Sequence, residues 1–529
     1  MKHIFCDVLV IGSGAAGLRA AISAKQKGLN VCVISKQAPG KSTCTTLSAG
    51  VFAAAEENKS ADNHLKRTLQ AGRGINQKEL VKVLVQEGPM RLRELKKWGI
   101  NAEFHRGYLF CKGRAPYRGR EIIQCLLTKN KLLGTRFISG QLVADLKPLD
   151  GTLGVLAYST KADKWMAINA KSVILATGGA GALYLRHDNP KRMLGDGYVL
   201  ALKAGAVLQD LEFVQFYPLG LAEPGLPAFL VPPNIADAGR LYNSRGENIL
   251  KIYKIFERPA AERARDKLSQ ALFIEIYKKK REVFLDLTEV SKLKWHENPF
   301  SATTLPILGE RYGAIHRPVR VAPMAHHTMG GVCIDTDATT SVPGLFAAGE
   351  VTGGLHGANR MGGNALTETL VFGARAGEAA AIWAKDNNSG PKTEVFKEAE
   401  IEKLTSVKQT ARSNSAELMA NLNKIIWREA GIVRNKRGLE FALNSVNKIS
   451  TEILQSRIGN PLDVQRRIET LLGAQAASLI IKAAIKRKES RGSHFREDFI
   501  EQDDDSWQGH IQVKLSRNGE ANWNFQAIS

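Results

Sequence analysis

Two adjacent histidines, His326 and His327, stand in the run PMAHHTMGG just before a glycine pair. Imidazole can ligate a metal, move a proton or hydrogen-bond to an anion, so the pair is a candidate for chemistry. Neither an HxxxH spacing nor a nearby cluster of carboxylates accompanies it, and the sequence therefore predicts no metal site. Adjacent side chains in an extended segment point to opposite faces, so only one of the two should face a given ligand.

A glycine pattern near the N-terminus is suited to binding phosphate. Gly12, Gly14 and Gly17 form GxGxxG between the apolar run DVLVIG and an alanine-rich stretch with a helical pattern. Gly12 permits a tight turn, Gly14 allows the backbone to approach a pyrophosphate, and Gly17 allows close packing of helix and strand. The free N–H groups at the start of the helix favour an anion. Because a second apolar strand follows, the segment predicts a dinucleotide-binding unit.

The second strand of this unit lacks the acid that normally holds a ribose. It ends with Ser35 and Lys36, so the ribose contact must come from Ser35 or from elsewhere in the chain. Two later runs, SVILATGGAG (172–181) and GLFAAGEVTGG (344–354), are again strands that end in glycine turns, and the second carries Glu350. We expect both runs to return to the same sheet. The sequence thus predicts one large, discontinuous flavin-binding domain with an insertion.

Composition limits the class of protein. With 529 residues, 44% of them hydrophobic, and 48 glycines, the chain should be a globular α/β protein of two or three domains. The six cysteines show no CxxC spacing, which favours reduced thiols in the cytoplasm over a disulfide framework. No run of 18 apolar residues is present, so direct membrane insertion is not expected. The first strand begins within four residues of Met1, which leaves no room for an export signal.

The formal net charge of +22 needs its own interpretation. Lysines and arginines are scattered along the chain, and the densest run, KKKRE at 278–282, is expected to be a solvated helix end. Nucleic acid is therefore not predicted as a partner. Attraction of anionic substrates or of an acidic protein partner fits the excess of positive charge better.

A series of motifs in a fixed order spans nearly the whole chain. It comprises ISKQAPGKSTCTTLSAG, LATGGAG with GDGY, LEFVQFYP, RARDKLSQAL, FLDL, PMAHHTMGG, FAAGEVTGGLHGANRMGGNAL and ESRGSHFREDFIEQDDDSW. In these motifs the chain resembles the succinate dehydrogenase/fumarate reductase flavoprotein family, which includes L-aspartate oxidase. The resemblance implies an α/β fold in which a Rossmann-like FAD-binding domain carries an inserted α+β capping domain and is followed by a C-terminal helical domain.

The expected domain boundaries follow from this resemblance. Residues 1–225 and 341–390 would form the FAD-binding domain, 226–340 the capping domain, 391–500 the helical domain and 501–529 a C-terminal tail. Apolar residues recur at helical spacing over 394–433, which predicts two or three packed helices. The tail run HIQVKLSRNGEANWNFQ alternates like a hairpin around Asn518 and Gly519. Its strands resemble the tail of succinate and fumarate enzymes more than that of aspartate oxidase.

The resemblance also assigns residues to the substrate. The family arginine that delivers a proton to the substrate carbon falls on Arg265, which precedes Asp266. A free arginine has a pKa above about 12, yet it can protonate a far more basic carbanion within hydrogen-bond reach. The alternative is a surface arginine paired with Asp266. His326 falls on the family's carboxylate-binding histidine, which leaves His327 a structural role, and Arg360 falls on the second carboxylate grip.

The sequence departs from the family at two places. Tyr217 replaces a histidine that touches substrate; a phenol can donate a hydrogen bond but carries no positive charge. In VPPNIADAGR (231–240), Pro232 falls near the family's relay glutamate and Ile235 on its relay arginine, while Asp237 retains a later acid. The usual proton path is therefore missing, and the substrate is either fumarate or succinate or a related, modified carboxylate.

The expected cofactor is FAD, bound without a covalent link. Many family members attach FAD through a histidine, but Thr43 occupies that position and Cys44 lies one residue out of register. A threonine hydroxyl is too weak a nucleophile to form the link, and a non-covalent flavin favours reduction over succinate oxidation. The helix after Gly363 would point its positive end at the flavin. The residues assigned to the cofactor are Gly12, Ser13, Gly14, Ala15, Ala16, Gly17, Ser35, Lys36, Ser42, Thr43, Ser48, Ala49, Gly50, Thr177, Gly178, Gly179, Asp196, Glu350, Arg360, Asn364 and Ala365.

The predicted function is hydride transfer between the flavin and a C–C bond of a carboxylate, in a cytoplasmic flavoprotein subunit. An iron–sulfur electron-transfer subunit is the expected partner, and any membrane association would come through partner subunits. L-aspartate oxidase is an alternative, although Tyr217 and the C-terminal tail count against it. A non-catalytic electron-transfer subunit is another, although Arg265, His326 and Arg360 are all retained.

Overall fold

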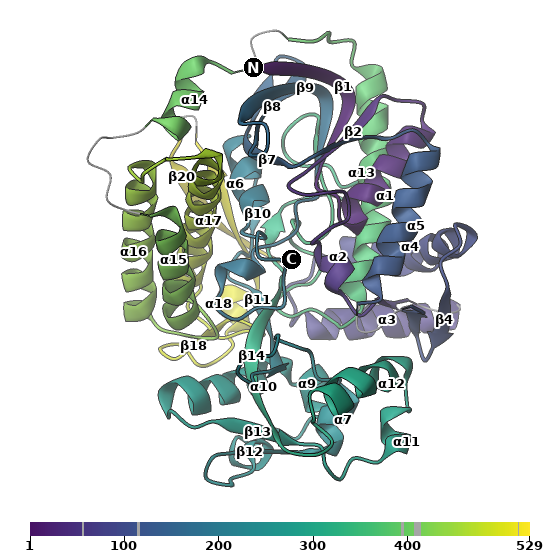
Figure 1. Cartoon of the computed structure of the whole chain (residues 1–529), viewed down its shortest axis with the longest axis vertical. Coiled ribbons are helices and arrows are strands. Elements are labelled where there is room, and N and C mark those ends of the chain that lie inside the picture. The colour runs from purple at the N-terminus through teal and green to yellow at the C-terminus, as the bar shows by residue number, and fades with distance from the viewer. Residues whose placement is uncertain (55–57, 114–116, 393–395, 407–413, 517, 529) are drawn as a thin grey trace.

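The computed structural model describes residues 1–54, 58–113, 117–392, 396–406, 414–516 and 518–528. Two lobes are visible in Figure 1. The lower lobe (residues 222–318) lies between two long antiparallel strands, β11 (Val214–Leu221) and β14 (Val319–Thr328), which connect it to the rest of the molecule. The remainder of the chain forms the upper lobe.

The upper lobe is built on a seven-stranded sheet. Its strands are β1 (Lys2–Ile11), β2 (Val31–Ser35), β6 (Arg136–Ser139), β7 (Gln141–Leu149), β8 (Thr152–Ser159), β9 (Lys164–Leu175) and β16 (Leu345–Ala347). The order is β6-β2-β1-β9-β8-β7, and β16 pairs with the end of β9. Strands β6, β2, β1, β9 and β16 are parallel, whereas β7 and β8 are antiparallel to their neighbours. The prediction that β9 and β16 return to the sheet of β1 is confirmed.

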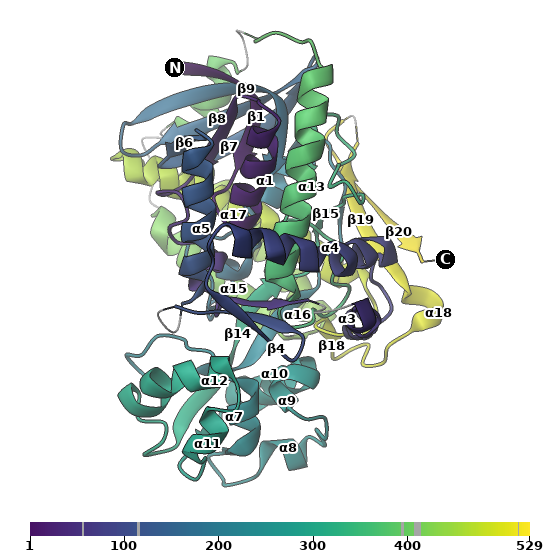
Figure 2. The ribbon, with the colours of Figure 1, turned by 90° about the vertical axis from the view of Figure 1, so that its right-hand side faces the viewer.

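Three helices lie side by side against this sheet (Figure 2). They are α1 (Ala15–Gln26), α5 (Gly119–Leu132) and α13 (Asn364–Asp386). Glycines allow α13 to approach α1 closely, because a Cβ on Gly377 would lie 2.2 Å from the carbonyl oxygen of Ala20. Helix α13 begins at Asn364, directly after Gly363 with φ +87°, as the sequence predicts.

Smaller elements surround the edge where the parallel strands end. A three-stranded sheet of order β3-β5-β4 lies there with helices that follow β2 in the chain. These elements are α2 (Cys44–Leu47), β3 (Val51–Ala53), α3 (Asn58–Ala71), α4 (Lys78–Lys97), β4 (Ala102–His105) and β5 (Tyr108–Cys111). Helix α6 (Asp196–Lys203) packs against β7 and connects the sheet to the C-terminal helices.

The lower lobe has a core of its own. Strands β12 (Arg240–Asn243) and β13 (Val283–Asp286) extend the β11–β14 pair into a sheet of order β11-β14-β13-β12. The first strand of this sheet, β11, begins at Val214 and therefore precedes the lower-lobe residues 222–318 in the sequence. The helices around it are α7 (Pro233–Ala238), α8 (Ile249–Ile252), α9 (Ala260–Arg263), α10 (Arg265–Phe273), α11 (Lys292–Trp295) and α12 (Pro299–Thr304). Their apolar faces bury Leu268, Leu285 and Trp295 completely or nearly so.

Three packed helices follow a short helix α14 (Glu398–Thr405): α15 (Ser415–Glu429), α16 (Lys436–Leu454) and α17 (Pro461–Lys486). Of the stretch 394–433, for which the sequence predicts two or three packed helices, the described residues form two helices, α14 and α15, and both pack against α17; residues 394–395 and 407–413 lie outside the described residues. Helix α17 is long and apolar enough to cross a membrane by length and composition. However, 78% of its most apolar window is buried, against α15, α16 and α6, which is the environment of a core helix.

The C-terminal tail forms the predicted hairpin. Strands β19 (Gly509–Leu515) and β20 (Ala521–Ala527) pair antiparallel, and Gly519 in the connection has a φ of +82°. Residue 517 of this turn lies outside the described residues. Through β10 (Leu208–Gln209), the hairpin joins β15 (Gly331–Val332) in a four-stranded sheet, so the tail packs onto the upper lobe.

Candidate active site

A cavity of about 490 Å³ lies where the two lobes meet. One wall comes from the upper lobe, from α2 and the loop before α13. The other wall comes from the lower lobe and the strands that carry it, with Tyr217, Glu262 and Arg265. His326 of β14 and Arg360 complete the polar part of the lining. The four residues that the sequence assigns to catalysis therefore face one cavity, although they are up to 143 positions apart.

Two buried arginines meet on one amide oxygen. Nη1 of Arg265 and Nη2 of Arg360 both donate to Oε1 of Gln215, at 2.9 and 3.0 Å, and each arginine is only 7% exposed. Within the described part of the chain, neither guanidinium has a carboxylate within 4 Å. Burial, and the charge of Arg265, lower the pKa of Arg360 to about 10. A buried cation without a counter-ion is costly, so the pair should attract an anionic ligand.

Arg265 does not pair with its neighbour in sequence. Oδ2 of Asp266 faces Nη2 of Arg73 at 3.4 Å, whereas Arg265, the first residue of α10, turns towards Gln215 and the cavity. The alternative of a surface arginine paired with Asp266 is therefore wrong. The reason lies in the helix start, where successive side chains point in different directions around the axis.

His326 has one ring nitrogen fixed and one available. Its Nδ1 donates to Oδ2 of Asp188 at 2.7 Å, and its side chain, 25% exposed, lines the cavity. A carboxylate partner orients the imidazole and holds the proton on Nδ1. Nε2 is then the nitrogen that a ligand in the cavity can reach.

His327 also lines the cavity, but its side chain is buried, with only 5% of the residue exposed. Its Nδ1 lies 3.6 Å from Oε1 of Glu350, and its ring packs edge-to-face with His356 at 5.2 Å. Burial, together with the nearby charge of Arg360, holds the pKa of His327 well below its usual value, so the ring is neutral. The two adjacent histidines thus occupy different environments.

Possible metal ligands that are distant in sequence lie near His327 in the fold. The fold brings His356 and Glu368, 29 and 41 residues further along, to within 4.8 Å of His327. Nε2 of His356 is hydrogen-bonded to Oε2 of Glu368 at 3.0 Å, whereas Nδ1 of His356 has no hydrogen-bond partner among the described residues. Sequence spacing cannot reveal this group, because its members come from three separate elements.

Tyr217 presents its ring, rather than its hydroxyl, to the site. The hydroxyl donates to the carbonyl oxygen of Val231 at 2.5 Å, and the residue is 4% exposed. The guanidinium carbon of Arg265 lies 5.4 Å from the ring centroid, and the ring of His326 lies 5.9 Å away. The aromatic face therefore packs against the guanidinium of Arg265 and the ring of His326, and the phenol proton is already donated to the backbone.

The glycine turn after β1 has the geometry of a phosphate cradle. Gly12 has a φ of +118°, and a Cβ there would lie 2.1 Å from the carbonyl oxygen of Ala176. A Cβ on Gly17 would lie 2.1 Å from the carbonyl oxygen of Gly12, whereas at Gly14 the nearest atoms are 3.8 Å away. The turn is therefore tight where β1, β9 and α1 meet and open at the start of α1. A pyrophosphate fits this arrangement.

Glu350 follows β16 and is buried at the cavity wall. Oε1 accepts a hydrogen bond from the backbone N–H of Thr328 at 3.1 Å. Burial raises the pKa of Glu350 to about 7, and the hydrogen bond and the charge of Arg360 offset only part of the effect. Gly179 packs against this carboxylate so closely that a Cβ would lie 2.4 Å from Oε1.

The other residues assigned to the cofactor fall into three sets. Ser48, Ala49, Gly50 and Ala365 line the cavity with Glu350 and Arg360. A second set follows the C-terminal ends of parallel strands or opens α1, α2 and α13: Ser13, Ala15, Ala16, Ser42, Thr43, Thr177, Gly178 and Asn364. Such an edge is where open α/β sheets bind nucleotides. The third set consists of Ser35, Lys36 and Asp196.

Three assigned side chains are engaged elsewhere. Nζ of Lys36 pairs with Oδ1 of Asp196 at 2.9 Å, and the hydroxyl of Ser35 donates to the carbonyl oxygen of Gln37 at 2.7 Å. None of the three is among the residues that line the cavity. Asn364 is fully buried and donates to Oγ1 of Thr68, so its amide fixes the start of α13.

Sequence reasoning missed three polar residues of this site. Gln215 holds both arginines, Asp188 orients His326, and Glu262 lines the cavity. Gln215 lies two residues before Tyr217 in the same motif, and this position could have indicated that it belongs to the site. Glu262 lies three residues before Arg265, about one helical turn, which is a weaker one. Asp188 stands in an irregular loop, where sequence offers no periodic cue.

Comparison with known proteins relates this arrangement to a family. A family model described as FAD binding domain matches residues 7–366, and one described as fumarate reductase flavoprotein C-term matches residues 419–528. The chain is 35% identical to a fumarate reductase (CoM/CoB) subunit of Methanothermobacter marburgensis, over 94% of this chain and 95% of that protein. It is 31% identical to L-aspartate oxidase of a Nostoc species, over 96% and 93%.

A solved structure of a fumarate reductase is also similar to this chain. The flavoprotein chain of a mutated E. coli quinol fumarate reductase superposes with a TM-score of 0.87 at 29% identity. The match covers 100% of this chain and 97% of that chain. The likeness therefore extends over both lobes, the C-terminal helices and the tail.

Proposed function

Because the chain belongs to the fumarate reductase/succinate dehydrogenase flavoprotein family, we propose that it reduces the C=C bond of a fumarate-type dicarboxylate. The chain is an FAD-dependent oxidoreductase of the class that acts on CH–CH groups. The observation that carries the choice of substrate is the pair of buried guanidiniums, Arg265 and Arg360, which face one cavity and have no carboxylate within 4 Å among the residues that the structure describes.

The substrate would be held through its carboxylates. Arg360 can bind one carboxylate with two parallel hydrogen bonds, because its planar fork matches the two oxygens. The doubly protonated form of His326, whose Nδ1–H is held by Asp188, would donate from Nε2 to the other carboxylate. The ring of Tyr217 forms an apolar wall against Arg265, where an uncharged C=C unit fits better than a third charge.

Bound FAD supplies the hydride for this reduction. Gly12, Gly14 and Gly17 would hold its pyrophosphate, and Glu350 together with residues 48–50 would hold parts nearer the cavity. Arg265 is the residue placed to protonate the other carbon. Burial lowers the pKa of this arginine, which makes it a better acid than a solvated one.

The electrons would come from a separate iron–sulfur protein. The six cysteines are free and lie in separate elements, and in the described residues the group of possible metal ligands consists of two histidines and a glutamate. Relatives of this chain, the M. marburgensis protein among them, are named as subunits of larger enzymes. We place the chain in the cytoplasm, with membrane contact only through partners.

FAD attachment is proposed to be non-covalent. Oγ1 of Thr43 caps α2 by accepting a hydrogen bond from the N–H of Thr46 at 3.1 Å. The thiol of Cys44 contacts Oδ1 of Asn189 at 3.2 Å, and burial raises its pKa well above the usual value. Neither group is an activated nucleophile. Acid precipitation should leave all yellow colour in the supernatant; flavin that stays with the denatured chain would contradict this.

The proposed activity can be tested on the photoreduced protein. We expect fumarate to reoxidise the flavin rapidly, an unsaturated monocarboxylate such as crotonate to act slowly, and L-aspartate to reduce the oxidised protein slowly or not at all. Reduction by L-aspartate faster than reoxidation by fumarate would favour L-aspartate oxidase. No response to any carboxylate would favour the electron-transfer subunit without a catalytic site.

A further inference from the structure

An arginine that protonates the substrate must regain its proton before the next turnover. Arg265 is 7% exposed, and its hydrogen bonds go to the carbonyl oxygen of Ala261 and to Gln215, neither of which can supply a proton in its ordinary state. Pro232 and Ile235 occupy the positions where the sequence comparison expects a relay, and Ile235 is a fully buried apolar residue. Some other acid must therefore reach Arg265.

Glu262 is an acid in the required place. It lies in α9, three residues before Arg265, and its side chain lines the same cavity. The side chain is 38% exposed, so it can also exchange protons with solvent. Nη2 of Arg67, from α3 in the upper lobe, lies 3.6 Å from Oε1 of Glu262. The carboxyl is thus paired with a solvent-accessible arginine and lines the same cavity as the buried Arg265.

Charged and phenolic groups surround Glu262. Four titratable groups face it: Arg67 of α3, Tyr108 of β5, Tyr217 of β11 and Arg265 of α10. Arg67 is held in place because its Nη2 donates to the hydroxyl of Tyr108 at 2.8 Å. Burial lowers the pKa of Arg265, and the negative charge of Glu262 is among the effects that partly restore it.

We propose that Glu262 returns the proton to Arg265 and so connects the active site to solvent; this role rests on the proposed function. In the step, a guanidinium N–H bond of Arg265 breaks, a C–H bond forms on the substrate, and the guanidine is left neutral. The O–H bond of protonated Glu262 then breaks, and the guanidinium re-forms. Solvent reprotonates the carboxylate. One proton thus passes from solvent to substrate for each hydride added to the other carbon.

Asp266 is the competing acid and is less suitable. Its carboxylate lies on the opposite side of Arg265, where the two residues share a separate cavity of about 10 Å³. That volume holds about one water molecule. Oδ2 of Asp266 is 3.4 Å from Arg73, and the side chain is only 7% exposed. The route through Asp266 therefore has less contact with solvent than the route through Glu262.

The test compares carboxylate variants on fumarate reduction by the FAD-loaded full chain with a reduced dye as donor. Glu262→Gln should lower kcat by about tenfold or more with little change in KM, because binding groups remain. Glu262→Asp should recover part of the rate. Formate, added as a small diffusible acid, should accelerate Glu262→Ala. Glu257→Gln is the matched control, since Glu257 is in the same lobe, pairs with Lys267 at 2.6 Å and does not line the cavity.

The pH profile distinguishes a proton route from a structural role. In Glu262→Gln, the rate should become limited by proton supply and fall more steeply as the pH rises, while Glu257→Gln follows the wild-type profile. Unchanged kcat in Glu262→Gln with an active wild type would overturn the role of Glu262 alone. The same follows if Asp266→Asn, instead of the Glu262 variants, shows the loss and the rescue by formate. A wild-type protein without turnover would overturn the proposed function as well.

Discussion

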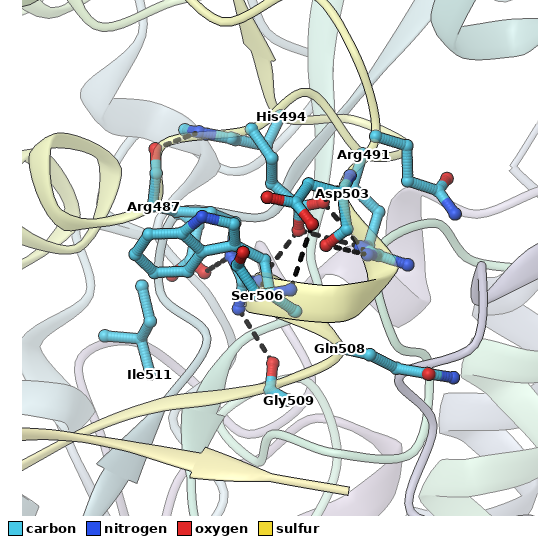
Figure 3. A network of polar contacts seen from close by, with 12 residues as sticks. Arg487, Arg491, His494, Asp503, Ser506, Gln508, Gly509 and Ile511 are labelled. Carbon is cyan, nitrogen blue, oxygen red and sulfur yellow. Dashed lines mark hydrogen bonds and ion pairs between the residues drawn. The ribbon is translucent and has the colours of Figure 1, made fainter.

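Two groups of buried arginines in this molecule differ in one respect, the presence of carboxylate partners. In the group beside the C-terminal tail (Figure 3), Nε of Arg487 lies 2.5 Å from Glu212, and Glu489 bridges Arg487 and Arg491 at 3.0 and 2.8 Å. In the cavity, Arg265 and Arg360 share only the neutral amide of Gln215. Both groups are buried to a similar degree.

The presence or absence of carboxylate partners indicates different roles for the two groups of arginines. Arg487 also donates to the carbonyl oxygens of Trp507 and Gly509, so the paired group ties the tail to the upper lobe without needing a ligand. In the described part of the chain, no carboxylate lies within 4 Å of the two cavity arginines, and a folded chain retains such charges at a cost in stability. We infer that, of these two groups, the one with carboxylate partners supports the fold, whereas Arg265 and Arg360 bind substrate.

The largest expected effect is that of Arg265→Gln on catalysis. Loss of the proton donor should lower turnover by about 10²–10⁴-fold, while FAD content and far-UV circular dichroism stay unchanged. Because the substitution removes an unpaired buried charge, the free energy of unfolding should not fall. Steady-state kinetics together with urea unfolding measure both quantities. Near-normal turnover would refute the assignment of Arg265.

Breaking the group of paired arginines should lower stability and leave catalysis nearly unchanged. Glu489→Gln leaves Arg487 and Arg491 without a shared counter-ion, and removal of one partner from a buried ion pair costs about 3–5 kcal/mol. Urea unfolding should show this loss, while kcat of the folded protein stays within about twofold of wild type. A stability loss for Arg265→Gln as large as that for Glu489→Gln would erase the proposed difference between the two groups.

Glu350 should make stability depend on pH. Its pKa in the folded protein is raised to about 7, above the unfolded value of about 4.3, so the protonated form is favoured by folding. Below about pH 4 the carboxyl is protonated in both states and does not change the free energy of unfolding. As the pH rises towards 7, the carboxyl lowers the free energy of unfolding increasingly. Glu350→Gln should therefore stabilise the flavin-free protein at pH 8, by up to about 3 kcal/mol, and have little effect at pH 4.5. Thermal unfolding at the two pH values measures this difference.

The adjacent histidines should respond differently to truncation. His326→Ala removes a hydrogen bond to a carboxylate, worth about 1.5–3 kcal/mol, so KM should rise roughly 10- to 150-fold. His327→Ala should change KM little and instead lower the melting temperature, because the ring is buried against His356. If His327→Ala raised KM more than His326→Ala, the substrate would lie on the other face of β14.

Tyr217→Phe should have the smallest effect. The hydroxyl is bonded to the carbonyl oxygen of Val231, so its loss should cost about 1 kcal/mol of stability and leave KM and kcat within about twofold. The ring that faces Arg265 and His326 is retained. A large increase in KM would mean that the hydroxyl leaves Val231 and binds substrate.

Local patterns allowed much of the fold to be predicted. The glycine turn at residues 12–17, the start of α13 at Asn364 and the three C-terminal helices each depend on a few neighbouring residues or on helical periodicity. Motif order likewise indicated which residues share the cavity. The local directions of side chains were harder to predict. That Tyr217 bonds to Val231, or that Asp266 turns away from Arg265, depends on rotamers and on distant elements.

The most direct measurement is calorimetric titration of the oxidised, FAD-loaded protein with succinate and with its monoamide, in wild type and in Arg360→Gln. We expect that succinate binds one site, that the monoamide binds at least about tenfold more weakly, and that Arg360→Gln abolishes the difference. Equal binding of succinate and its monoamide by the wild-type protein would show that the unpaired arginines are not the site of a dicarboxylate.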